Sequence, residues 1–306
     1  MSANESAAFI DGFWDDEIVP TITDYIRIPN KSPGFDAEWE ANGHMERVLQ
    51  IALAWIEAHP LAGMEVTVGR LPGRTPLILV EVPGQVDRTV LMYGHLDKQP
   101  ESEGWREGLG PWEPVYEDGK LYGRGGADDG YALFAAFCSL LDLERSGTPH
   151  ARAAIIIEFC EESGSTDLEA YFHHFADRIG TPDLVVALDS GAGNYDQLWS
   201  TTSLRGMAAA VLRVDVLTEG VHSGDASGVV PDSFRVARQL LSRVEDPDTG
   251  EVLLPAFQVA IPEDRRRQAE ASASFLGEEV WRRFPWAGST GPVDPDPVEA
   301  ILARTW

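Results

Sequence analysis

The sequence has little cysteine and no long apolar run. Its 306 residues include two cysteines, Cys138 and Cys160, each within an apolar segment. Two cysteines cannot build a disulfide framework or a cysteine-based zinc motif, so we interpret both as small buried side chains. No apolar stretch approaches the roughly 20 residues of a membrane span, and no basic segment followed by an apolar one opens the chain. We therefore expect a cytoplasmic protein without a membrane partner.

Basic residues are also scarce. The chain has 24 Lys and Arg against 50 Asp and Glu, which gives a net charge of −26. Such a surface repels nucleic acid, so we expect no nucleic-acid partner. The excess of acid is compatible with cation binding, although most of these side chains must be solvated surface.

Hydrophobic strands alternate with amphipathic helices over residues 62–194. This pattern predicts an α/β fold, with a sheet covered by helices on both faces. A hairpin is expected around Asp118-Gly119, and Thr166 with Glu169 predicts a capping box before a helix over 167–179. Strands are expected over 64–71, 76–82, 89–94, 153–162 and 182–191, and further helices over 4–28, 39–59 and 128–147.

The pattern changes near residue 198. Residues 205–217 alternate more than the earlier strands do, and residues 231–246 form an amphipathic helix that begins at a proline. We therefore predict a first domain over 1–198 and a second, smaller α+β domain over 199–306.

Acids and one histidine follow successive buried segments of the chain. In an open α/β sheet, the ends of parallel strands meet at one edge, where ligands bind. Several converging carboxylates repel one another unless a cation neutralises them. A histidine among carboxylates suits zinc, manganese or cobalt. The residues concerned are His95 with Asp97, Asp128 with Asp129, Glu161 with Glu162, and Asp189.

His95 and Asp97 show how such a site is built. Residues i and i+2 of an extended chain point the same way, so Asp97 can accept the second ring N–H of His95. Each residue of the set also has an ordinary structural explanation, as a hydrogen bond, a helix cap or a solvated acid. Those roles account for each residue singly, but they do not explain why all of these residues follow successive buried segments.

These motifs, in this order, resemble peptidase family M20, the dinuclear zinc amidohydrolases of aminoacylase, carboxypeptidase and carnosinase type. They are "YGHLDKQP", "LYGRGGADDG", "EFCEESGS" and "VALDSG". The resemblance implies a zinc-peptidase-like mixed sheet with an α+β dimerisation domain, or lid. It implies hydrolysis of an amide bond in dipeptides or N-acylated amino acids by a metal-bridged water, and a homodimer formed through the lid.

The resemblance also implies a role for each residue. His95 and Asp189 would bind one metal and Glu162 the other. Asp128 would bridge the two metals, with a cis peptide bond before Asp129. Two Zn²⁺ ions are implied, with Mn²⁺ or Co²⁺ as alternatives.

Three further residues would assist catalysis. Glu161 would be the general base, and Asp97 would orient His95. His222, in the lid, would reach a partner subunit's active site and stabilise the oxyanion.

Two departures from the family pattern stand out. The chain reads "DDGY" where the family usually has Lys-Gly after the two acids, and no histidine follows His222. The family's late histidine and the segment that returns from the lid are missing. We therefore expect the N-terminal part of a longer enzyme, with the lid incomplete.

Other classes of protein remain as alternatives. The chain could be a non-catalytic fragment that acts only as a metal-binding or dimerisation module. A dinucleotide-binding oxidoreductase is disfavoured, because the glycine-rich turns do not complete G-x-G-x-x-G and strand-end acids would repel a pyrophosphate. A serine hydrolase is disfavoured because no G-x-S-x-G elbow is present.

Overall fold

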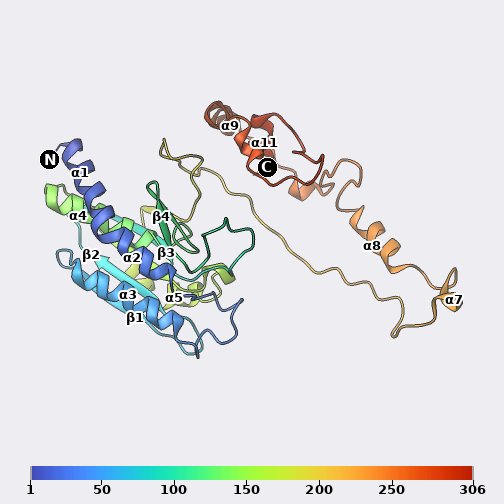
Figure 1. The fold of residues 1–306 in the computed structure, drawn as a ribbon, viewed down its shortest axis with the longest axis horizontal. Coiled ribbons are helices and arrows are strands. Elements are labelled where there is room, and N and C mark those ends of the chain that lie inside the picture. The colour runs from blue at the N-terminus through green and yellow to red at the C-terminus, as the bar shows by residue number, and fades with distance from the viewer. Residues whose placement is uncertain (1, 305–306) are drawn as a thin grey trace. The chain divides into compact units, whose positions relative to one another are not determined.

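A computed structural model describes residues 2–304 of the chain (Figure 1). The chain divides into two compact units, of which one ends at Gly191 and the other begins at Ala192. The change of pattern in the sequence predicts this boundary between residues 198 and 199. Among the described residues, no helix is long and apolar enough to cross a membrane.

The first unit contains a five-stranded mixed sheet in the order β1-β2-β6-β3-β7. β2 is antiparallel to both β1 and β6, whereas β3 runs parallel to β6 and to β7. The carboxyl ends of β6, β3 and β7 therefore meet at one edge. The strands are β1 (Glu65–Gly69), β2 (Leu77–Val82), β3 (Val86–His95), β6 (Ala151–Glu158) and β7 (Leu184–Ala187).

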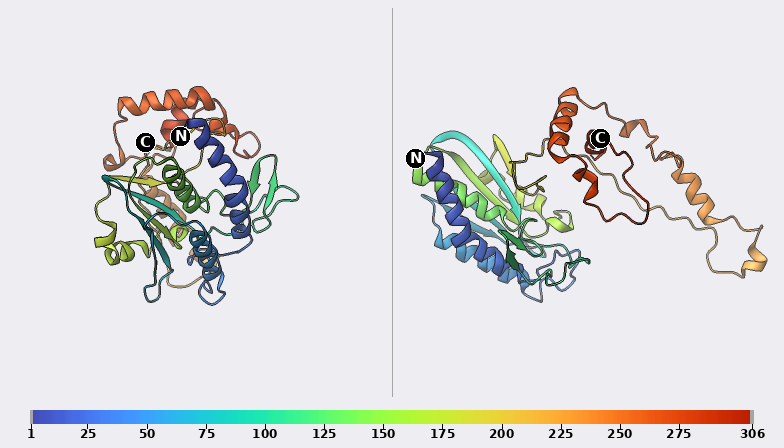
Figure 2. Two further views of the ribbon diagram at one scale, coloured as in Figure 1. Left: turned by 90° about the vertical axis from the view of Figure 1, so that its left-hand side faces the viewer. Right: turned by 45° about the horizontal axis from the view of Figure 1, so that its top comes forward.

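Helices pack on both faces of this sheet, as the sequence predicts (Figures 1 and 2). Because side chains alternate along a strand, Ile155 and Ile157 of β6 join the cluster formed with the long helices, while Ile156 joins Tyr171 and Phe175 on the other face. The first face carries α1 (Ala3–Phe13), the π-helical turn η1 (Trp14–Ile18), α2 (Val19–Ile26), α3 (His44–Ala58) and α4 (Ala132–Ser146); the second carries α5 (Leu168–His174) and α6 (Ala176–Ile179).

Two local predictions have opposite outcomes. β4 (Val115–Glu117) and β5 (Lys120–Tyr122) form the expected hairpin, with positive φ at both Asp118 and Gly119. The predicted capping box before α5 is wrong, because Asp167 is the N-cap residue and its side chain does not cap the helix. The Asp167 carboxylate instead accepts hydrogen bonds from the Arg74 side chain and from Thr75.

The second unit has helices as its secondary-structure elements, joined by long irregular segments, where the structure describes it. The alternation over residues 205–217 indicates a strand, but these residues form none in the described structure. The helix predicted over residues 231–246 forms as α8. The elements are α7 (Ser223–Ala226), α8 (Ser233–Leu241), η3 (Pro255–Phe257), α9 (Glu263–Leu276), α10 (Glu279–Arg282) and α11 (Pro297–Ala303).

Candidate metal centre

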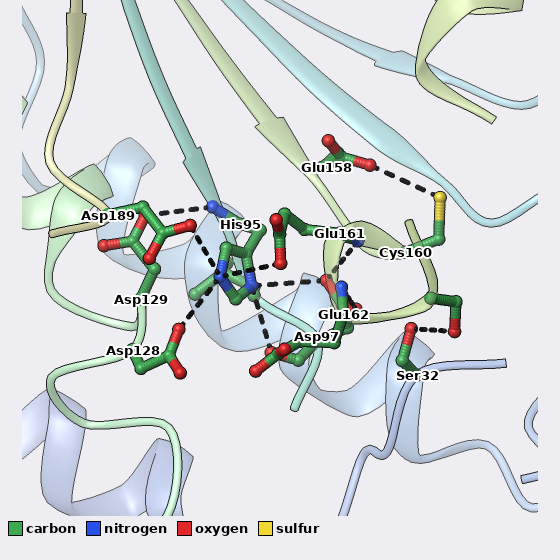
Figure 3. A network of polar contacts seen from close by, with 12 residues as sticks. Ser32, His95, Asp97, Asp128, Asp129, Glu158, Cys160, Glu161, Glu162 and Asp189 are labelled. Atoms are coloured by element: carbon green, nitrogen blue, oxygen red, sulfur yellow. Dashed lines mark hydrogen bonds and ion pairs between the residues drawn. The ribbon is translucent and has the colours of Figure 1, made fainter. Parts of the chain in front are cut away.

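The predicted site residues of the first unit meet at the carboxyl edge of the sheet (Figure 3). His95 is the last residue of β3. Glu161 and Glu162 lie in the short helical turn η2 (Glu161–Ser163) that follows β6, and Asp189 follows β7. Asp128 comes from the loop between β5 and α4. The topology thus brings together residues that lie as far apart in the chain as 95 and 189.

The Nε2 atom of His95 points into a group of carboxylates. It lies 3.3 Å from Oδ1 of Asp128, 3.7 Å from Oε2 of Glu161 and 3.8 Å from Oδ2 of Asp189. The His95 side chain is fully buried, whereas the three acids are partly exposed. The ring is therefore at the floor of the site, and the carboxylates stand between it and solvent.

Asp97 lies on the other side of the ring. Nδ1 of His95 is 3.3 Å from Oδ1 of Asp97 and 3.2 Å from the Asp97 backbone carbonyl. The same carboxylate accepts hydrogen bonds from the backbone N–H groups of Glu161, at 3.1 Å, and Glu162, at 3.0 Å. Asp97 therefore holds the ring and the acidic turn together, and Nε2 is left free to face the carboxylates.

Two groups of side chains offer metal ligands among the described residues. His95, Asp128 and Asp189 form one group, and His95, Glu161 and Glu162 form the other. Within each group the candidate ligand atoms lie within 4.8 Å of one another. His95 belongs to both groups, but its Nε2 can bind one ion only. The Asp128-Asp129 peptide bond is cis, as the resemblance implies.

The electrostatics of the site reflect crowded carboxylates. Burial opposes charge on His95, but the nearby carboxylates of Asp128 and Asp97 outweigh burial and raise its pKa to about 11. Burial, reinforced by neighbouring acids, raises the pKa of Asp129 to about 8 and that of Glu161 to about 7. The raised pKa values show that uncompensated negative charge is unfavourable at this site, and a bound cation would relieve it.

The donor set fits a divalent metal. Buried side-chain atoms without a hydrogen-bond partner in the described chain include Nε2 of His95 and Oε1 of Glu162, and both residues belong to a group of candidate metal ligands. Buried polar atoms are normally hydrogen-bonded, so atoms of this kind at one site indicate a missing ligand. One imidazole with several carboxylates is a donor set that suits zinc, manganese or cobalt.

Gln99 and Lys98 support this site without having been predicted from the sequence, and Asp129 of the predicted acidic set supports it too. Gln99 donates a hydrogen bond of 2.6 Å to Oε2 of Glu162, which leaves Oε1 free. Asp129 is fully buried, and its Oδ2 accepts a bond from the His95 backbone N–H. Lys98 is also fully buried and donates to the carbonyls of Tyr25 and Ile28. Gln99 and Lys98 stand inside "HLDKQP", so the motif itself was the available signal.

His222 belongs to the second unit, and its predicted role stays a prediction. It is the N-cap residue of α7, where its Nδ1 accepts a hydrogen bond of 3.1 Å from the backbone N–H of Gly224. Its side chain is exposed.

Comparison with known proteins adds an independent observation. Residues 91–250, more than half of the chain, match Peptidase family M20/M25/M40. The human Beta-Ala-His dipeptidase is 28% identical over 262 residues, which is 79% of this chain and 49% of that protein. The Cysteinylglycine-S-conjugate dipeptidase of Corynebacterium striatum is 30% identical over 221 residues, or 71% of this chain and 46% of the relative. The chain thus spans about half the length of these curated relatives.

Solved structures share the fold. The di-peptidase Dug1p from Saccharomyces cerevisiae matches with a TM-score of 0.63 at 19% identity, over 99% of this chain and 64% of that one. Human carnosine dipeptidase 1 matches with a TM-score of 0.60 at 21% identity, over 94% and 69%. At this identity the likeness supports the mixed sheet and the unit that follows it.

Proposed function

Because this chain belongs to Peptidase family M20/M25/M40, we propose that it carries the metal centre of a hydrolase that cleaves amide bonds in dipeptides or N-acylated amino acids. The observation that supports this best is the group of carboxylates around Nε2 of the buried His95. Family membership implies a divalent metal, and two of the relatives compared above are named as dipeptidases. Nothing in these comparisons favours a non-catalytic module.

We propose zinc as the metal and two ions per complete site. His95 and Asp189 would hold one ion and Glu162 the other, with Asp128 shared between them. The two free donor atoms, Nε2 of His95 and Oε1 of Glu162, fit this division because each belongs to a different ion. When bound, such ions lower the pKa of a coordinated water and polarise a carbonyl group.

Glu161 is the residue that we assign as general base. Its carboxylate lies 3.7 Å from Nε2 of His95 within the acidic group, where a carboxylate can accept a proton from a water held beside it. Its carboxylate is partly exposed, so both water and substrate have access to it. Glu161 would accept a proton from the attacking water and deliver it to the leaving nitrogen.

The second unit would supply the dimer contact. We propose that residues 199–306 belong to the lid and that His222 donates to the developing oxyanion in a partner subunit's site. The family resemblance supports this role, and the exposed position of His222 leaves its ring accessible.

A substitution of the base tests the proposal. The zinc-loaded chain is assayed against dipeptides and N-acetyl amino acids beside Glu161→Gln, which keeps the shape of the side chain but removes its basicity. We expect turnover to fall by roughly 10²–10⁴-fold and the zinc content, measured by elemental analysis, to stay the same. Ordinary turnover by Glu161→Gln would contradict the assignment.

The bridging role needs its own variant. Asp128→Ala should lose both ions together, because the two would share this carboxylate. Retention of both ions by Asp128→Ala would remove Asp128 as the bridge.

A further inference from the structure

The segment "DDGY", where the chain departs from its family, has a physical explanation at Gly130. A Cβ atom at this position would lie 2.4 Å from Cε1 of Tyr25 and 2.5 Å from the carbonyl oxygen of Gly125. Both distances are far shorter than a van der Waals contact, so no side chain fits here. The departure therefore leaves the next residue, Tyr131, as the first large side chain after the two acids.

Tyr131 connects α4 to the segment that carries Asp189. Its hydroxyl group donates a hydrogen bond to the backbone carbonyl of Leu188, the residue directly before Asp189. Tyr131 is also the N-cap residue of α4, and its own carbonyl accepts a bond of 2.9 Å from the N–H of Ala135. The hydroxyl therefore projects from a fixed helix end.

The Asp189 segment has less support than the other site segments. Within residues 2–304, β7 is an edge strand that pairs with β3 alone, and Leu184 and Val185 are each more than half exposed. The chain leaves β7 after Ala187, and the first unit ends at Gly191. Glu162 differs, because Gln99 and Asp97 hold its side chain and its backbone N–H.

We propose that Tyr131 is a positioning residue for Asp189. Its bond to the Leu188 carbonyl fixes the backbone from which the Asp189 carboxylate reaches to within 3.8 Å of Nε2 of His95. The inference rests on the proposed function, because Asp189 is positioned to bind metal. It predicts a selective effect, in which loss of the hydroxyl weakens the site that uses Asp189 and spares the one that uses Glu162.

The test is calorimetric titration of the metal-free full chain with Zn²⁺. Tyr131→Phe removes the hydroxyl and keeps the ring, and Tyr116→Phe is the matched control, since Tyr116 is exposed on the β4–β5 hairpin. Asp189→Asn identifies the binding event that depends on Asp189. We expect Tyr131→Phe to weaken that event by roughly 10–100-fold, the usual effect of losing a group that orients a ligand. Any other zinc-binding event should keep its affinity.

A double variant separates positioning from a general structural effect. If Tyr131 acts through Asp189, then Tyr131→Phe should cause no further weakening in the Asp189→Asn background. Unchanged affinity in the single variant, or the same loss in both backgrounds, would overturn the inference while leaving the metal centre in place. A folded wild-type chain that binds no zinc would instead contradict the proposed function, and the inference with it.

Discussion

At the scale of single residues, His95 shows how positive and negative charge offset each other in the site. Its pKa rises to about 11 because Asp128 and Asp97 outweigh the effect of burial. The imidazolium that results neutralises part of the surrounding negative charge. A bound cation would replace this proton, so the same carboxylates that favour protonation also favour metal binding.

Asp97 gives a residue-scale prediction about metal affinity. It contacts the His95 ring and accepts from the N–H groups of Glu161 and Glu162. In Asp97→Asn an amide NH₂ replaces one of the two accepting oxygens, so the ring or the turn loses its support. We expect zinc affinity to fall by roughly 10–100-fold, measured by titration with a competing chelator. Asp118→Asn, on the hairpin, is the control and should bind zinc normally.

Lys98 gives a residue-scale prediction about stability. Its ammonium group donates to the carbonyls of Tyr25, at 2.8 Å, and Ile28, at 2.7 Å, and lies 3.7 Å from the centre of the Tyr25 ring. Lys98→Met keeps the length of the side chain but removes one donor from each of two buried carbonyls, which keep backbone hydrogen bonds from Ile28 and Asn30. We expect the free energy of unfolding in urea to fall by about 2–5 kcal/mol.

A matched lysine serves as the control for that experiment. Lys120→Met, at an exposed position of β5, should change the free energy of unfolding by less than about 0.5 kcal/mol. An equal loss in both variants would contradict the role assigned to buried Lys98.

At the scale of elements, the sequence could predict the buried strands and the amphipathic helices. The apolar runs of β2, β3 and β6 and the spacing of α3 and α4 reflect burial of their own residues, which the sequence records directly. The strand expected over residues 205–217 depends on a pairing partner, and the cap of α5 depends on what else its acid contacts. Both are tertiary facts that local sequence does not contain.

In the candidate site, too, some features could be predicted from the sequence and others depend on tertiary contacts. The ends of β3, β6 and β7 could be foreseen, so the convergence of His95, Glu161 and Asp189 could be too. The contact of Asp97 with His95 could be foreseen as well, but the bond from Tyr131 to Leu188 could not, because it joins residues 57 positions apart, at the start of a helix and just beyond an edge strand. No period or motif encodes such a pair.

Gly94 gives a prediction at the junction of β3 and α4. A Cβ atom there would lie 2.5 Å from Cβ of Ala132 and 2.9 Å from Oδ2 of Asp129. Gly94→Ala should therefore push the start of α4 away from the strand and destabilise the chain by about 1–3 kcal/mol in urea unfolding. Gly12→Ala, at a helical position with open space around it, should be neutral or slightly stabilising. Equal behaviour of the two variants would show that this close contact is not required.

At the scale of the whole molecule, excess acid makes stability depend on pH. Asp129, Glu161 and His95 all have folded pKa values above their ordinary values, at about 8, 7 and 11. Between the ordinary and the raised pKa, the folded state binds more protons than the unfolded state. Stability from such groups is therefore lost as the pH rises. Groups whose pKa is lowered, such as Asp128, stabilise the folded state at neutral pH and lose that contribution only as the pH falls through the acidic range.

The metal-free chain should consequently melt at a lower temperature as the pH is raised from about 5 to about 8. Zinc should oppose this trend, because deprotonated ligands bind metal more tightly and binding stabilises the folded state. Thermal melting with and without zinc across this range measures both effects. A metal-free melting temperature that rises with pH would contradict the account of the acidic cluster.

The central claim is that the carboxylates around His95 form a metal centre, and the most direct test is the zinc content of the folded chain. Elemental analysis after equilibration with zinc and desalting gives the number of ions per chain. We predict at least one bound zinc ion per chain, and a marked loss of that zinc in His95→Gln, which removes the donor at the floor of the site. A folded chain that retains no zinc would contradict the claim.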